Sequence, residues 1–204
     1  MKLSDLITPE TSAGTALFLQ WEGYHVFAIP QRELQHSEQQ VRFFGVGGKR
    51  QAQESLIDCA LREGREEIGA VITQLDSAAQ TFFFKADGSI DLMNLSDDSV
   101  RPRLILEKRI HSLHGSMANR LAAYYLVAFN ASLSGKPIPS NEIAAIVYLK
   151  DFHLALMRRL PNLTVSDLLA QGAQVESQLN CRLAQSTVLV AHGTAKFLMR
   201  QLPP

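Results

Sequence analysis

The first 150 residues contain several short stretches in which apolar residues either alternate with polar ones or run continuously, and both patterns are typical of strands. Residues 15–21 and 24–30 lie on either side of a Glu22-Gly23 pair, so the pattern predicts a hairpin. The run 122–133 is the strongest, because it is rich in aromatic and branched residues that favour an extended backbone. Further strands are expected over 71–75, 80–86, 103–110 and 143–149.

A helical pattern appears once before residue 150 and then dominates the remainder of the chain. Leu56, Ile57, Leu61 and Ile68 fall on one stripe and predict an amphipathic helix. Beyond residue 150, helices are expected over 151–160, 165–171 and 183–202. The length of 204 residues suits one domain over 1–150, with a helical extension over 151–204 that packs on the same domain.

Residues 86–103 are expected to form a loop, because aspartates are dispersed there among Gly, Ser and Asn. The aspartates are either turn formers that face solvent or part of a lid that completes a site.

Net charge, cysteine content and the lengths of the apolar runs limit the partners and the cellular location that we expect. Twenty basic and twenty acidic residues balance to zero, which argues against a nucleic-acid polymer as partner. Cys59 and Cys181 provide neither a disulfide framework nor zinc-site spacing, and Cys59 is expected to be a small core residue. The sequence shows no leader pattern and no apolar run of membrane-spanning length. We expect a cytoplasmic protein that acts on a small molecule and has no membrane partner.

Three glutamates crowd within one turn of the helix expected around residue 60. Glu63, Glu66 and Glu67 are three and four residues apart, so like charges lie side by side, at a cost of roughly 0.2–0.5 kcal/mol per pair. One interpretation is a solvated acidic face that Arg62 and Arg65 partly neutralise. The other is a site for a hard divalent cation, which selects carboxylate oxygens.

The spacing of residues over a longer segment favours one of these two interpretations of the glutamates. From Gly48 to Ala70 the chain matches the pattern G-x5-E-x7-R-E-U-x-E-E-x-G-U, where U is a bulky apolar residue. This is the signature of the Nudix hydrolases, and the chain closely resembles them. There are two departures, since Gly64 occupies an apolar place and Ala70 is small. The fixed polar and glycine places are filled by Gly48, Glu54, Arg62, Glu63, Glu66, Glu67 and Gly69.

The resemblance implies an α+β fold of the Nudix type, an α/β/α sandwich with a mixed β-sheet, here with extra C-terminal helices. It also implies a pyrophosphohydrolase that uses Mg²⁺ or Mn²⁺ to cleave a nucleoside diphosphate linked to another moiety. By this pattern Glu63, Glu66 and Glu67 hold the metal and carry the catalysis, and the carbonyl of Gly48 is a further ligand. Which glutamate acts as the base stays open. Glu54, Arg62 and Gly69 are structural, with Glu54 and Arg62 paired.

The residues outside the Gly48–Ala70 segment, which is called the box below, have less specific roles. Glu142, which precedes the strand expected over 143–149, is either an additional metal ligand or base, or a cap or turn partner. Arg32, Lys49, His111 and His114 are candidates for substrate contact, with ordinary polar surface or loop residues as the alternative.

The substrate is not specified by the sequence. The proline expected of ADP-ribose hydrolases and the tyrosine of dinucleoside polyphosphate hydrolases are both missing near Ala86. A MutT-like nucleoside triphosphate pyrophosphohydrolase is an alternative, because Phe44, Gly47, Gly48 and Lys49 are similar to the F-P-G-G-K entry of that group. A non-catalytic Nudix module that senses or binds a ligand is the third reading. The C-terminal helices are expected to provide packing surface or a homodimer contact.

Overall fold

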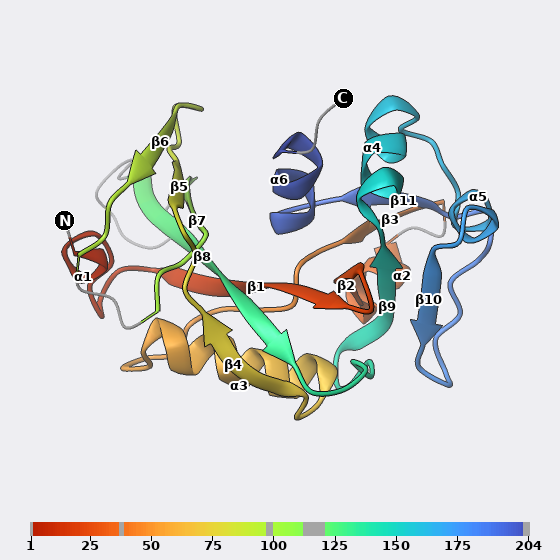
Figure 1. Cartoon of the computed structure of the whole chain (residues 1–204), viewed down its shortest axis with the longest axis horizontal. Helices are drawn as coiled ribbons and strands as arrows, with labels where there is room; N and C mark the ends of the chain where they lie inside the picture. Colours follow the sequence, from red (N-terminus) through yellow and green to blue (C-terminus); the bar gives the residue numbers. More distant parts are fainter. Residues whose placement is uncertain (1, 37–38, 97–99, 112–120, 202–204) are drawn as a thin grey trace. The chain divides into compact units, whose positions relative to one another are not determined.

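The computed structural model describes residues 2–36, 39–96, 100–111 and 121–201. Within these ranges strands and helices are mixed, and the expected α+β class is confirmed (Figure 1). Every helix in the described part of the chain is too short or too polar to cross a membrane. In chain order the elements are α1 (Leu3–Leu6), β1 (Ala13–Trp21), β2 (Tyr24–Pro30), α2 (Gln31–His36), β3 (Gln40–Phe43), α3 (Leu56–Ile68), β4 (Ile72–Asp76), β5 (Thr81–Phe84), β6 (Ile90–Met93), β7 (Leu104–His111), β8 (Leu121–Leu133), β9 (Ile143–Leu149), α4 (Asp151–Arg159), α5 (Val165–Ala170), β10 (Gln174–Ser177), β11 (Val188–Ala191) and α6 (Thr194–Gln201).

The chain forms two compact units that are interleaved along the sequence. Several elements, including β1 and α3, begin in one unit and end in the other. The boundary expected at residue 150 stays a prediction. The first unit comprises Met1–Ala16, Gly47–Arg62 and Leu75–Asn130, and the second comprises Leu17–Val46, Glu63–Gln74 and Ala131–Pro204.

In the second unit the strand order is β10–β9–β2–β1, with antiparallel pairing throughout. The predicted hairpin is confirmed, because Leu19 pairs with Val26, and both turn residues, Glu22 and Gly23, have positive φ. All seven residues of β9 are buried, as its continuous apolar sequence requires of a central strand. Tyr148 in β9 is among the largest fully buried side chains and lies opposite Val26.

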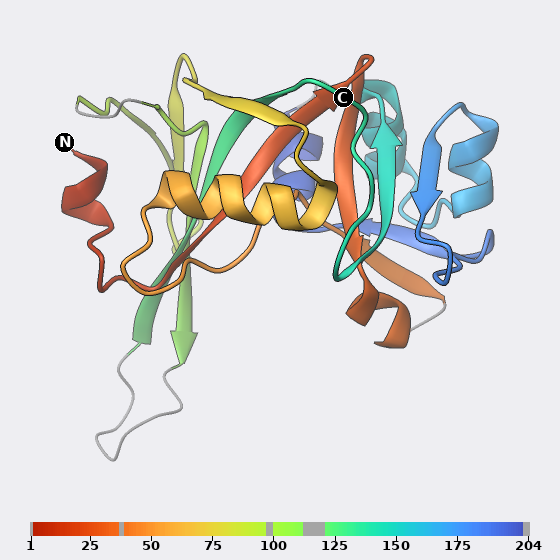
Figure 2. The ribbon, with the colours of Figure 1, turned by 90° about the horizontal axis from the view of Figure 1, so that it is seen from below.

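The prediction that the chain is wholly helical after residue 150 is wrong in two places. β10 adds to the edge of β9, and α5 lies beside it (Figure 2). Val188–Ala191 is a strand that pairs in parallel with β3, where a single long helix was predicted. Its branched residues favour extended backbone, and Gly193, with φ of +55°, separates the strand from α6.

In the first unit the strand order is β8–β7–β5–β6, and the pairing of β5 with β7 is parallel. The sheet is therefore mixed, as expected. The prediction of a loop over residues 86–103 is wrong for Ile90–Met93, which pairs with β5. The connecting turn has Gly88 at φ +89°, and Asp87 Oδ1 accepts a hydrogen bond of 2.8 Å from the Ser89 amide. Asp87 is thus a turn former, which is the first of the two interpretations given for these aspartates.

The helix α3 approaches its neighbours closely at Gly64. A Cβ added there would overlap the Cδ1 atom of Ile72 and lie 3.1 Å from Cδ1 of Leu17. Leu17 is fully buried, whereas Ile72 is only half-buried and ends in a flexible ethyl group. The sequence leaves two alternatives for Gly64, an ordinary helical glycine that tolerates alanine or a point of close approach, and the packing supports the close approach.

We expect Gly64→Ala to lower the free energy of unfolding by about 1 kcal/mol, because overpacking outweighs the gain from removing a helical glycine. Urea unfolding measures the change. The double variant Gly64→Ala/Ile72→Val removes the clashing carbon and should recover part of the loss relative to Ile72→Val alone. Equal effects of Gly64→Ala in both backgrounds would contradict the assigned contact.

Candidate active site on helix α3

Both ends of α3 are defined by local interactions. Ser55 Oγ accepts a hydrogen bond of 3.0 Å from the Asp58 amide and donates one of 2.7 Å to Asp58 Oδ2, which caps the first turn. At the other end, Gly69 has φ of +82°, and its amide donates to the Arg65 carbonyl at 3.1 Å. A left-handed residue of this kind is a common helix terminator, so Gly69 ends the helix directly after the glutamates.

The ion pair between Glu54 and Arg62 joins the loop before α3 to the helix. Arg62 Nε donates to Glu54 Oε1 at 2.7 Å, and Nη2 donates to Oε2 at 3.0 Å. Glu54 Oε2 also accepts from the Gln51 amide, and Arg62 reaches the Lys49 carbonyl. The hydrogen bonds from Arg62 lower the pKa of Glu54 from 4.5 to about 2. This is the structural pair that the box resemblance implies.

The segment around Gly48 packs tightly against the start of β1. The Gly48 carbonyl accepts a hydrogen bond of 2.9 Å from the Thr15 amide, and Gly47 has φ of +144°. Cys59 is fully buried, as expected of a core residue, and its sulfur accepts a hydrogen bond from Thr15 Oγ1. The Cys59 thiol also donates to the Gly48 carbonyl, at 3.9 Å. The metal-ligand role of Gly48 stays a prediction.

The three glutamates of the box differ in burial. Glu63 is 9% exposed and Glu67 is 5% exposed, whereas Glu66 is exposed. Glu63 and Glu67 are four residues apart, so their side chains lie on one face of α3, one turn from each other. Carboxylates are seldom buried, because removing their charge from water is costly. The burial of Glu63 and Glu67 therefore distinguishes them from a solvated acidic face.

The C-terminal turn of α3 is tied to the segment that carries Glu142. Ser140 Oγ and Asn141 Nδ2 each donate to the Glu66 carbonyl at 2.8 Å, and the Ser140 amide donates to the Glu67 carbonyl. Glu142 follows directly and is exposed, while its own carbonyl accepts from the Gln31 amide. The segment thus serves as a C-terminal cap of the helix, and the role of the Glu142 carboxylate stays a prediction.

The remaining predicted residues are spread over several elements. Arg32 is exposed on α2, and Lys49 is exposed in the loop before α3. His111 is the last residue of β7, and His114 lies outside the described residues. Within residues 2–36, 39–96, 100–111 and 121–201, no group of three or more His, Cys, Asp or Glu side chains is placed to hold one metal ion. The metal site stays a prediction.

An ion pair between the buried Glu33 and the half-exposed Arg42 was missed by sequence reasoning. Glu33 is 4% exposed and accepts two hydrogen bonds from Arg42, at 2.8 and 2.9 Å. Burial opposes ionisation of this carboxylate, but the bonds from Arg42 outweigh it and hold the pKa of Glu33 below its ordinary value. The partners come from α2 and β3, and no motif in the sequence links them. The pair holds these two elements together.

Comparison with solved structures finds Nudix hydrolases, at low sequence identity and with low TM-scores. The dihydroneopterin triphosphate pyrophosphohydrolase of E. coli is 15% identical, with 74% of this chain and 86% of that chain covered and a TM-score of 0.42. A MutT Nudix hydrolase from Burkholderia pseudomallei is 14% identical over 70% and 85% of the two chains, with a TM-score of 0.40. An ADP-ribose pyrophosphatase from Streptococcus suis is 13% identical over 69% and 75%, also with a TM-score of 0.40. No protein-family model matches the sequence, and no curated protein matches it either. Function is therefore inferred from this chain's own residues.

Proposed function

We propose that this protein is a metal-dependent pyrophosphohydrolase of the Nudix type that cleaves a nucleoside diphosphate linked to another moiety. The observation that carries the proposal is the burial of Glu63 and Glu67 on one face of α3, inside a box whose seven fixed polar and glycine places are all filled. Their side chains are 9% and 5% exposed, and charges that are largely removed from water interact more strongly with a bound cation.

The donor type suits Mg²⁺ or Mn²⁺, because hard divalent cations select carboxylate oxygens, and one or two carboxylates suffice where water and substrate phosphate complete the ligand shell. Glu63 and Glu67 are proposed as the ligands, and the exposed Glu66 as the group that reaches water or a further ligand position. When bound, the metal would neutralise charge on the pyrophosphate and lower the pKa of its water. The Glu54–Arg62 pair keeps the preceding loop in place against the helix.

The proposal is tested with a panel of substrates under defined metal conditions. ADP-ribose, a dinucleoside polyphosphate, NADH and the nucleoside triphosphates are incubated with Mg²⁺ or Mn²⁺, and the products are separated by ion exchange. We expect hydrolysis of at least one of the diphosphate-linked compounds, complete loss with EDTA, and recovery when metal is restored. Preference for nucleoside triphosphates would favour the MutT-like alternative. Saturable nucleotide binding without hydrolysis of any compound would overturn the proposed activity and favour a binding module.

Metal binding itself gives a second expected outcome. Calorimetric titration should show weak binding of Mg²⁺, and a non-hydrolysable nucleoside diphosphate analogue should tighten it, because phosphate oxygens complete the ligand shell. The triple variant Glu63→Gln/Glu66→Gln/Glu67→Gln should lose both effects. Equal binding by the wild type and the triple variant would place the metal elsewhere. The homodimer and the cytoplasmic location expected from the sequence stay predictions.

A further inference from the structure

The first compact unit contains a cavity of about 430 Å³ that the proposed function does not use. Its walls come from α1 and the residues after it, from the loop Arg50–Ser55 with the first turn of α3, and from Val100 and Phe129. The volume lies within the range of pockets that bind small molecules. The lining does not include the glutamates of the proposed active site.

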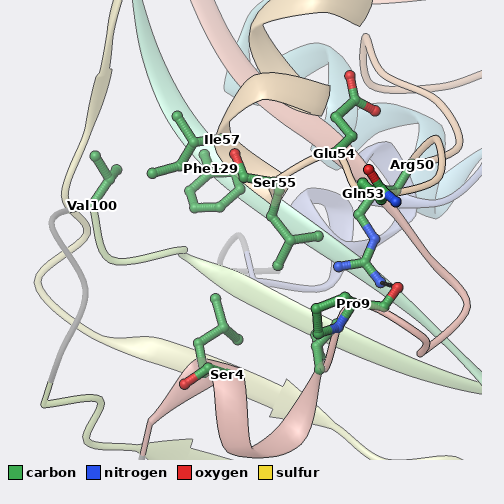
Figure 3. Close-up of a pocket in the computed structure, with 12 residues that line it drawn as sticks. Ser4, Pro9, Arg50, Gln53, Glu54, Ser55, Ile57, Val100 and Phe129 are labelled. Atoms are coloured by element: carbon green, nitrogen blue, oxygen red, sulfur yellow. Dashed lines mark hydrogen bonds between the residues drawn. The ribbon is translucent and has the colours of Figure 1, made fainter.

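The lining is divided into an apolar part and a polar part. Leu3, Ile7, Leu56 and Phe129 are apolar, and Leu3, Ile7 and Phe129 are buried. In Figure 3, Val100 and Ile57 lie on one side of the cavity, and Arg50, Gln53 and Glu54 gather on the opposite side. A cavity of this kind offers an apolar surface for the body of a ligand and hydrogen-bonding groups for one end.

Arg50 gives the polar side a positive charge, and hydrogen bonds to three backbone carbonyls hold its guanidinium in place. Its Nη2 donates to the carbonyls of Thr8 and Pro9, at 2.8 and 3.0 Å, and to that of Thr11. Glu54 carries a negative charge, but its carboxylate is paired with Arg62 through two hydrogen bonds. The Glu54 carboxylate is therefore committed to Arg62, and the other acid near Arg50, Glu10, is exposed and lies outside the lining. Among the described lining residues, Arg50 is the one cationic side chain.

The polar side is also shaped before any ligand arrives. Gln53 has φ of +63°, a backbone conformation uncommon for a residue other than glycine. The adjacent Glu54 is fixed by Arg62 and the Gln51 amide. Arg50 and Gln53 stand at variable places of the box pattern, so the box does not require them. Preorganised polar groups of this kind lower the entropy cost of binding.

We propose that this cavity binds a small monoanionic amphiphile, with an aromatic or branched apolar body on the Leu3–Phe129 surface and a carboxylate-like group near Arg50. A nucleotide is a poor occupant, because several phosphate charges would face one cation and the carboxylate of Glu54. The body can be about the size of two fused aromatic rings, given the cavity volume. Because the loop that holds Glu54 forms one wall, an occupant stabilises that loop.

The test uses 2-naphthoate as the probe and 2-naphthylmethylamine as its cationic counterpart, followed by amide chemical shifts of the full chain. We expect saturable one-to-one binding of 2-naphthoate, with shift changes concentrated in residues 3–9 and 50–57. The amine should bind several-fold more weakly, since its charge faces Arg50. Val100→Trp and Ser4→Trp each place a large side chain at the cavity and should abolish binding. Ile90→Trp, on exposed β6 outside the lining, is the matched control and should bind as the wild type does.

Failure of 2-naphthoate to bind, or shift changes outside the lining segments, would overturn the proposed site. Unchanged binding by both cavity variants would do the same. Equal or tighter binding of the amine would overturn the assigned ligand chemistry. None of these readouts depends on hydrolysis, so the cavity and the proposed enzymatic activity can fail independently.

Discussion

Glu67→Gln is expected to lower metal-dependent hydrolysis by about a hundredfold or more, and Glu63→Gln should act similarly. Each change removes one charge from the buried pair on α3 that is proposed to hold the metal, and the loss of one preorganised electrostatic partner commonly has this magnitude. Glutamine has nearly the same shape, and it relieves repulsion of a few tenths of a kcal/mol. The melting temperature without metal should therefore stay the same or rise. Initial rates on the best substrate of the panel, with thermal unfolding of each variant, measure both effects.

Controls on the same helix separate a catalytic effect from a general one. Asp58→Asn removes an exposed charge in the first turn of α3 but keeps a side-chain oxygen that can accept the Ser55 hydrogen bond, so the rate should stay within about twofold of the wild type. Glu66→Gln changes the exposed member of the acidic set, and we expect reduced turnover with no change in stability. Wild-type rates in both Glu63→Gln and Glu67→Gln would remove α3 from the mechanism.

Stability of the protein should depend on pH through Glu54 in a defined acidic range. The hydrogen bonds from Arg62 lower the pKa of this carboxyl to about 2, against 4.5 for an unperturbed group. The unfolded chain binds the proton more tightly, so the stabilisation is complete above about pH 5 and is lost as the pH falls from 4.5 towards 2. A difference of this size corresponds to about 3 kcal/mol. Glu54→Gln should therefore lower the free energy of unfolding at pH 7 by about that amount.

The pH profile distinguishes the pair from other sources of stability. Between pH 5 and pH 3, the free energy of unfolding should fall less steeply in Glu54→Gln than in the wild type, as measured by urea titration at each pH. Glu22→Gln, in the exposed turn of the hairpin, is the matched control and should keep the wild-type slope. Parallel profiles for the wild type and Glu54→Gln would show that the ion pair does not carry the acid sensitivity.

Local spacing was sufficient to predict the features that depend on a single element or a short loop. The hairpin follows from two apolar runs around Glu22-Gly23, and the end of α3 follows from Gly69. The pairing of Glu54 with Arg62 follows from the box pattern, and the two hydrogen bonds between their side chains show it. In each case the partners lie within about ten residues of each other, so backbone geometry alone brings them together.

Contacts between distant segments were beyond the reach of the sequence. The strands β6 and β11 form because partners in β5 and β3 pair with them, and short stretches with weak patterns of their own take their conformation from such partners. The ion pair of Glu33 and Arg42 likewise depends on how α2 meets β3. The sign of the Gly64→Ala effect depends on Ile72, which comes close to α3 only in the folded unit.

The same division applies to the candidate active site and to the cavity. The sequence by itself determined that three glutamates occupy adjacent positions of one helix, because the helical repeat places residues three and four apart on one side. Only the tertiary structure decided that Glu63 and Glu67 are buried while Glu66 is exposed, because burial depends on what the rest of the fold packs against each face. It also brought the N-terminal segment against the loop of Arg50, which forms the cavity. Side-chain burial and cavities are products of long-range packing, and a linear pattern does not encode them locally.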